Sequence, residues 1–117
     1  MARPIAVQAR RHDRHRSAAV EAALGRSLKT YIDDSILNSS GSEGYVLRAR
    51  SRARGRSGNT LAVVESTSIV HGQELHYLSM TTLGAGHFVT ATFTATDARF
   101  AEISSQVEPH LRTLRAI

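Results

Sequence analysis

The stretch that decides the fold runs from His87 to Ala95 and reads HFVTATFTA. Within it, Val89, Ala91 and Phe93 alternate with threonines. Because successive side chains of a strand point to opposite faces, this pattern predicts a strand with one apolar face and one hydroxyl-bearing face. An apolar sheet face has to be covered, so we expect helices packed on that side.

Three further runs with strand-like alternation precede this stretch, at residues 44–53, 60–70 and 74–83. Short turns that contain glycine separate all four runs. Connections of this length join antiparallel strands, because a parallel crossover needs about a dozen residues or more. The sequence therefore predicts a four-stranded antiparallel meander.

Apolar residues recur at spacings of three and four on both sides of the meander, which is the pattern of a helix with one apolar stripe. The first stripe, within residues 17–38, predicts a helix capped by Ser17 and ended by the serine and glycine residues of 39–44. The second, within residues 100–114, contains Pro109, which predicts a kink or break there. The predicted fold class is α+β, with both helices packed on one face of the sheet and the other face exposed.

The length of 117 residues, or 12.7 kDa, is that of one domain. We expect a basic N-terminal segment over residues 1–16, in which residues 5–9 can form a short edge strand, and a single α+β domain over residues 17–117. The absence of cysteine excludes disulfides and thiolate metal sites. The apolar runs are short and the first residues are polar, which predicts no membrane span and a cytoplasmic protein.

Arginine is concentrated in two segments of the chain, which carries a net charge of +5. Residues 44–59 hold five arginines and no acid, and residues 1–16 hold five arginines against Asp13. The residues predicted to bind a polyanion or an acidic partner are Arg48, Arg50, Arg52, Arg54, Arg56, Arg10, Arg11 and Arg14.

The arginines from Arg48 to Arg56 occupy alternating positions. On a strand, at least the first three would then stand in one row, about 7 Å apart. Guanidinium groups pair bidentately with phosphate and carboxylate, so such a row suits a nucleic-acid backbone, an acidic protein surface or an anionic lipid. The alternative is a solvated sheet face whose charge is balanced by Glu65 and Glu74 on neighbouring strands.

Motifs for catalysis or for a cofactor are not found in the sequence. There is no Gly-x-Ser-x-Gly turn for a nucleophile, and the adjacent Asp33 and Asp34 would diverge on a helix. His71, Glu74 and His76 lie close enough in sequence to hold a metal, but surface histidines beside a turn are the commoner outcome. Aromatic residues make up only 5% of the chain, which disfavours sequence-specific reading of nucleic acid. We predict that the protein is not an enzyme and has no cofactor or metal.

Four features carry a family resemblance: Gly44-Tyr45 at the start of the first strand, the strand at residues 88–94, the segment from Asp97 to Phe100, and LRTLR at residues 111–115. With the order of the elements, they resemble the PsbP-like superfamily, especially its DcrB-like branch, over residues 17–115. The usual opening hairpin of the family is missing. Members are mostly not enzymes; they act as accessory subunits, import factors that bind small GTPases, lipoproteins, or chaperones for transmembrane segments. The resemblance implies binding through the sheet or its edges.

The sequence thus leads us to expect a non-enzymatic protein-binding module, adaptor-like or chaperone-like, that uses the exposed sheet face or a strand edge. A homodimer is one form of this hypothesis, because a second copy could cover an open edge. The alternative is polyanion binding through the arginines and the basic N-terminus. A third hypothesis is a ligand-binding or catalytic cleft between the first helix and the sheet.

Overall fold

The computed structural model describes residues 5–11, 14–96, 99–101 and 108–114. Its elements are β1 (Ile5–Arg11), β2 (Arg14–Ala22), α1 (Leu28–Ser39), β3 (Val46–Arg54), β4 (Thr60–Val70), β5 (Gln73–Gly84) and β6 (His87–Thr96). Short helical stretches follow β6 at residues 99–101 and 108–111.

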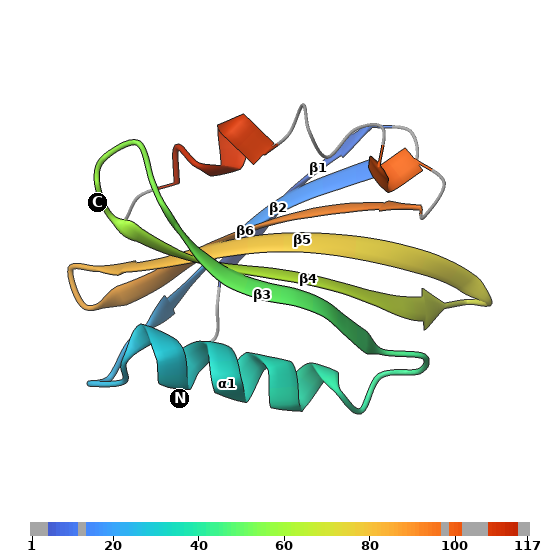
Figure 1. Ribbon diagram of the computed structural model, residues 1–117, viewed down its shortest axis with the longest axis horizontal. Helices are drawn as coiled ribbons and strands as arrows, with labels where there is room; N and C mark the ends of the chain where they lie inside the picture. The colour runs from blue at the N-terminus through green and yellow to red at the C-terminus, as the bar shows by residue number, and fades with distance from the viewer. Residues whose placement is uncertain (1–4, 12–13, 97–98, 102–107, 115–117) are drawn as a thin grey trace.

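The strands form one sheet in the order β1-β2-β6-β5-β4-β3, with antiparallel neighbours throughout (Figure 1). Strands β3 to β6 follow one another in space as they do in sequence, so the α+β class and the antiparallel meander are confirmed. The N-terminal strand expected within residues 5–9 is present as β1, and β2 beside it makes the sheet six-stranded. The boundary that we expected after residue 16 falls inside β2.

The prediction of a helix from Ser17 is wrong, because that part of the chain is strand β2 and α1 begins only at Leu28. Leu24 and Gly25 have φ angles of 51° and 79°, which turn the chain out of β2 and interrupt any helix through this point. The N-cap of α1 is Ser27, whose hydroxyl oxygen accepts a hydrogen bond from the backbone N–H of Thr30 at 3.1 Å.

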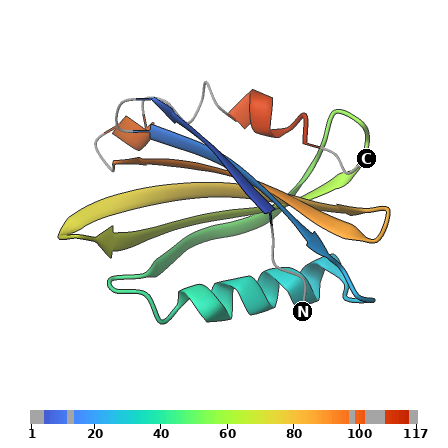
Figure 2. The same ribbon diagram turned by 180° about the vertical axis from the view of Figure 1, so that it is seen from behind.

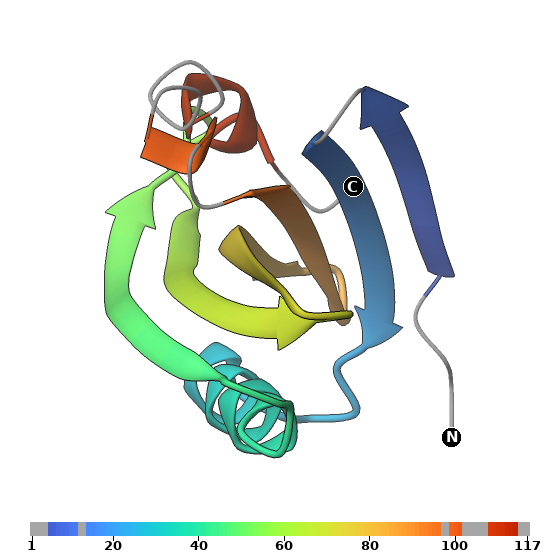
Figure 3. The ribbon, with the colours of Figure 1, turned by 90° about the vertical axis from the view of Figure 1, so that its right-hand side faces the viewer.

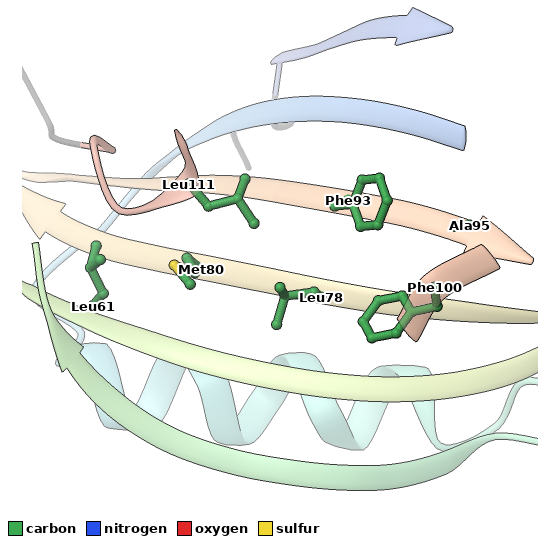
Figure 4. Close-up of a cluster of buried hydrophobic side chains, with 7 residues drawn as sticks. All are labelled: Leu61, Leu78, Met80, Phe93, Ala95, Phe100 and Leu111. Atoms are coloured by element: carbon green, nitrogen blue, oxygen red, sulfur yellow. The ribbon is translucent and has the colours of Figure 1, made fainter. Parts of the chain in front are cut away.

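The helical segments lie on opposite faces of the sheet, so the prediction that both pack on one face is also wrong. Front, rear and end views all place α1 on one side and the short C-terminal helical stretches on the other (Figures 1, 2 and 3). The side with the C-terminal stretches carries the main core (Figure 4), made of Leu61, Leu78, Met80, Phe93, Ala95, Phe100 and Leu111. These residues bury the apolar face that the stretch from His87 to Ala95 predicted, without any contribution from α1.

Helix α1 therefore covers the face on which β6 places its threonines. It is attached there by Ile32, which is 4% exposed, and by Tyr31, whose ring stacks on that of Phe88 with a centroid distance of 4.1 Å. The guanidinium carbon of Arg26 lies 5.3 Å from the centroid of the Tyr31 ring, and Arg26 forms an ion pair with Glu21 at 2.7 Å. These contacts are grouped near the start of the helix, over Phe88 of β6 and beside the turn after β2.

Candidate functional site

Strand β3 is the outermost strand on one side of the sheet, and its outer edge has no neighbouring strand. Eight of its nine residues are exposed, and only Ala53, which packs against the main core, is half-buried. An edge of this kind presents backbone N–H and C=O groups that can pair with another extended chain. The predicted arginines from Arg48 to Arg54 therefore lie on an open strand edge.

A β-bulge breaks the expected arginine row. The register between β3 and β4 shifts between Leu47 and Ala49, so that Arg48 has no partner in the ladder. The Nε of Arg48 lies 3.2 Å from the hydroxyl oxygen of Thr67, a residue that is 1% exposed. Thr67 shares its face of β4 with Leu61 of the main core, since the two are an even number of positions apart. Arg48 thus contacts the face opposite to that of Arg50, and the prediction of one row from Arg48 to Arg52 is wrong.

The arginines beyond the bulge lie on the side of α1. Arg50 forms an ion pair with Asp33 of α1, with 2.7 Å between Nη2 and Oδ1. Directly opposed residues of an antiparallel pair share a face, so Arg52, opposite Ala62, is on this side as well. Together with Lys29, these two arginines line a groove of about 300 Å³ between the first turns of α1 and β3, which we call the cationic groove.

Asp33 is the acid that partly neutralises the cationic groove. It accepts hydrogen bonds from Lys29 at 2.8 Å and from Arg50. Both bonds lower the pKa of its carboxyl group, and the bond from Lys29 has the larger effect. One carboxylate thus serves two cations. Arg52, Arg54 and Arg56 have no carboxylate within ion-pair distance among the residues that the structure describes. The groove and the adjoining edge therefore keep a positive charge.

The acids that the sequence suggested as counter-charges do not take that role. Glu65 pairs with His76 at 2.8 Å, and His76 stacks on Phe100 of the main core, so both lie on the face away from α1. Glu74 is exposed and pairs with Ile69 in the ladder. Asp33 was not predicted as the counter-charge, because its contact with Arg50 is tertiary and leaves no mark in local spacing.

The second basic segment is not brought to the same place. Arg10 and Arg11 belong to β1 and Arg14 to β2, at the edge of the sheet opposite to β3. In the ladder, Arg11 pairs with Arg14, and Arg10 with His15. The eight arginines of the predicted site are thus divided between the two edges of the sheet.

The remaining histidine of the metal hypothesis lies in a turn. His71 is exposed and has a φ of 52° in the β4–β5 connection, whereas His76 is directed at Glu65 and Phe100. In the described part of the chain, His71, Glu74 and His76 are therefore not brought together as one set of metal ligands.

Comparisons with known proteins identify the fold. A protein of unknown function from Pseudomonas aeruginosa, PA94, matches with a TM-score of 0.82 at 12% identity, over 98% of this chain and 83% of its own. LpqN of Mycobacterium tuberculosis, which is involved in cell envelope biogenesis, matches with a TM-score of 0.65 at 10% identity, over 81% of this chain and 58% of its own. The cyanobacterial PsbP of Synechocystis matches with a TM-score of 0.64 at 14% identity, over 90% of this chain and 76% of its own.

The chain has a PsbP-like fold. This confirms the fold that the resemblance implied, while membership of the superfamily and of its DcrB-like branch stays a prediction. No family model and no curated protein sequence matches the chain. None of the helices in the described part has the length and apolar character that a membrane span requires.

Proposed function

We propose that this chain is a non-enzymatic module that binds another protein by adding an acidic, extended segment to the edge of β3. The observation that carries the proposal is the open edge itself, with eight of nine residues exposed and arginines on it. In strand addition, backbone hydrogen bonds supply the affinity and alternate side chains supply the specificity.

The faces of the sheet are less suitable than its edge. The C-terminal helical stretches cover one face and α1 lies on the other (Figure 3). The protein-binding hypothesis named the exposed sheet face and a strand edge as possible surfaces. The strand edge is therefore favoured.

Charge decides which partner suits the edge. Arg50, Arg52 and Arg54 recur every second residue, so an acidic side chain at every second position of an added strand would lie opposite a guanidinium group. A second copy paired through its own β3 would instead bring arginines toward arginines, which is unfavourable. An acidic partner is accordingly preferred to a homodimer through this edge.

The names of the similar structures support a role other than catalysis, since none of the three names is that of an enzyme. An adaptor or chaperone role, membership of the DcrB-like branch and a cytoplasmic location belong to the proposal and rest on the sequence resemblance and composition.

Binding of a peptide that alternates glutamate and valine, followed by fluorescence anisotropy, tests the proposal. We expect the double variant Arg52→Ser/Arg54→Ser to weaken binding about tenfold or more. Arg112→Ser should leave binding unchanged, because this guanidinium group pairs with Glu108 and only the backbone oxygen of Arg112 contacts the β3–β4 turn. Asp33→Asn should strengthen binding, because it releases Arg50. The same peptide with N-methyl groups on alternate backbone amides should not bind. If it binds as well as the unmodified peptide, strand addition is wrong. If neither peptide binds, the proposed class of acidic partner is wrong.

The cationic groove favours polyanion binding as the second candidate. Lys29, Arg50 and Arg52 converge there with one acid between them. Single-stranded RNA and anionic vesicles are the probes, and binding that falls steeply with salt and is lost on Arg52→Ser would support this candidate. Unlike strand addition, it predicts no dependence on free backbone amides in the ligand.

A further inference from the structure

Helix α1 does not close tightly onto the sheet, because the face beneath it is built from small hydroxyl side chains. Strands β4, β5 and β6 place Ser66, Ser79 and Thr90 on this side through their two-residue alternation. Two cavities of about 190 and 230 Å³ lie between the helix and the sheet. They adjoin at the shared lining residues Ser39, Tyr45, Ser66 and Ser79, and we call the two cavities together the hydroxyl groove.

The 190 Å³ cavity, under the middle of α1, is amphipathic. Its apolar side comes from Ile32, Ile36 and the ring of Tyr31 on the helix, with Val64 opposite. Its polar side consists of serine and threonine hydroxyls of the sheet. No charged side chain lines either cavity among the described residues. A charged ligand would lose its hydration here without gaining a counter-charge, so the groove selects an uncharged one.

Several hydroxyl groups of the groove are already paired. Thr81 and Thr90 share a hydrogen bond of 2.8 Å, and the Ser68 hydroxyl donates to the Tyr77 oxygen at 2.9 Å. Ser66 differs from them, since it is only 9% exposed, lines both cavities and has no side-chain hydrogen bond to any residue in the described part.

Ser79 and Tyr45, which flank the same junction of the two cavities, also make no side-chain hydrogen bond within the part of the chain that the structure describes. Within the described part, Oδ1 of Asn59 is the only buried side-chain polar atom without a hydrogen bond, so these three hydroxyl oxygens are accessible to solvent. Three hydroxyls at one junction are thus available to a molecule that enters the groove, and each can both donate and accept.

The size of the groove sets the size of the ligand. A dry apolar cavity of about 150 Å³ accommodates benzene, so the 190 Å³ cavity under α1 holds one ring with a small substituent. We infer that the hydroxyl groove is a binding site for an uncharged single-ring alcohol, of the phenol or cyclohexanol class, with its ring against Ile32 and Ile36 and its hydroxyl at the junction of Ser66, Ser79 and Tyr45. Burial raises the pKa of the Tyr31 hydroxyl, whose ring lines the groove.

This site is independent of the β3 edge, and its test uses the whole chain. Titration with p-cresol, followed by the backbone amide signals in two-dimensional NMR, should shift signals of α1 and of Ser66 and Ser79. Toluene, which has the same ring without a hydroxyl, should bind several-fold more weakly, and 4-hydroxybenzoate, which adds a charge, should not bind. Arg52→Ser should leave cresol binding unchanged, so that failure of the edge proposal would not affect this one.

Two variants separate a ligand site from a cavity that only holds water. Ser79→Leu fills the groove and should weaken cresol binding tenfold or more, because the ring then has no space to enter. Ser57→Leu, in the exposed β3–β4 turn, should leave cresol binding unchanged. Tyr45→Phe keeps the ring and the fold but removes one hydroxyl, and should weaken cresol about two- to tenfold while leaving toluene unaffected. Absence of any cresol-induced shift in the groove, or equal binding by Ser79→Leu and Ser57→Leu, would overturn the inference; if Ser79→Leu does not fold, the Tyr45→Phe comparison decides.

Discussion

Tyr31 connects α1 to the sheet through an aromatic contact. Its ring stacks on Phe88, and burial, followed by the nearby Glu21 carboxylate, raises the pKa of its hydroxyl above the ordinary value of 10.0. The folded protein therefore holds this proton more tightly than the unfolded chain does. Its contribution to stability is complete below pH 10 and is lost as the pH rises through the raised pKa.

Substituting Tyr31 by phenylalanine should remove this part of the alkaline loss of stability. We expect the urea midpoint of Tyr31→Phe to fall less steeply above pH 10 than that of the unchanged protein, because phenylalanine has no proton to release on unfolding. Tyr45→Phe, at the hydroxyl groove and not against Phe88, is the matched control. Equal slopes for Tyr31→Phe and the unchanged protein above pH 10 would contradict the prediction.

Gly44 occupies a position that no other residue fits well. Its φ is 64°, and a Cβ there would lie 2.7 Å from Cδ1 of Ile69. We expect Gly44→Ala to lower the free energy of unfolding by about 2 kcal/mol, through backbone strain and the displaced isoleucine. Gly25→Ala, with a φ of 79° but open space, should lose about 1 kcal/mol from strain alone. Gly41 has neither a positive φ nor a close neighbour, so Gly41→Ala should leave the free energy of unfolding unchanged. Urea unfolding should rank the three variants in this order, and any other order would refute the explanation.

At the scale of elements, the strands of the meander are predictable because their signals are local. Alternation and glycine turns locate β3 to β6 to within a few residues. The apolar spacing from Val20 to Leu28 predicted a helix wrongly, because the alanine-rich residues 18–23 are compatible with both a helix and a strand. The pairing of β2 with β6 decides for the strand. The bulge at Arg48 is likewise invisible in the sequence, since alternation continues through it while the ladder shifts.

The C-terminal helical stretches are short, yet the core depends on them. Phe100 is 6% exposed and stacks on His76 with a centroid distance of 3.6 Å. Phe100→Ala would leave a cavity over the sheet and should lower the free energy of unfolding by about 3–5 kcal/mol. Leu37→Ala, on the exposed side of α1 at 71% exposure, should change it by about 0.5 kcal/mol or less. Comparable chemical-denaturation midpoints for the two variants would show that the C-terminal stretch does not cover the core.

For the molecule as a whole, the sheet separates an apolar layer from a hydroxyl-lined one, and the sequence shows that difference but not its consequences. The stretch from His87 to Ala95 predicts both faces correctly. Which helix lies on which face depends on tertiary packing that no local pattern records. The candidate site was affected in the same way: the arginines are on the predicted strand, but their division between faces and edges, and the partner of Arg50, follow from tertiary pairing.

The same asymmetry predicts how the molecule opens. Helix α1 rests over cavities and is held mainly by Ile32, the Tyr31–Phe88 stack and the Asp33–Arg50 ion pair, whereas β5 and β6 lie between other strands and beneath the main core. Separating α1 from the sheet exposes less apolar surface than separating β5 from β6, so it should occur with a lower free energy.

Native-state hydrogen exchange measured by NMR tests this order. We expect the amides of α1 to exchange through a local opening well before those at the centre of β5, such as Met80, which exchange only on global unfolding. Asp33→Asn should speed exchange in α1 and leave β5 unchanged, since the ion pair with Arg50 fastens only the helix. If α1 and β5 exchange together in both proteins, the helix is as firmly packed as the core and the predicted order of opening is wrong.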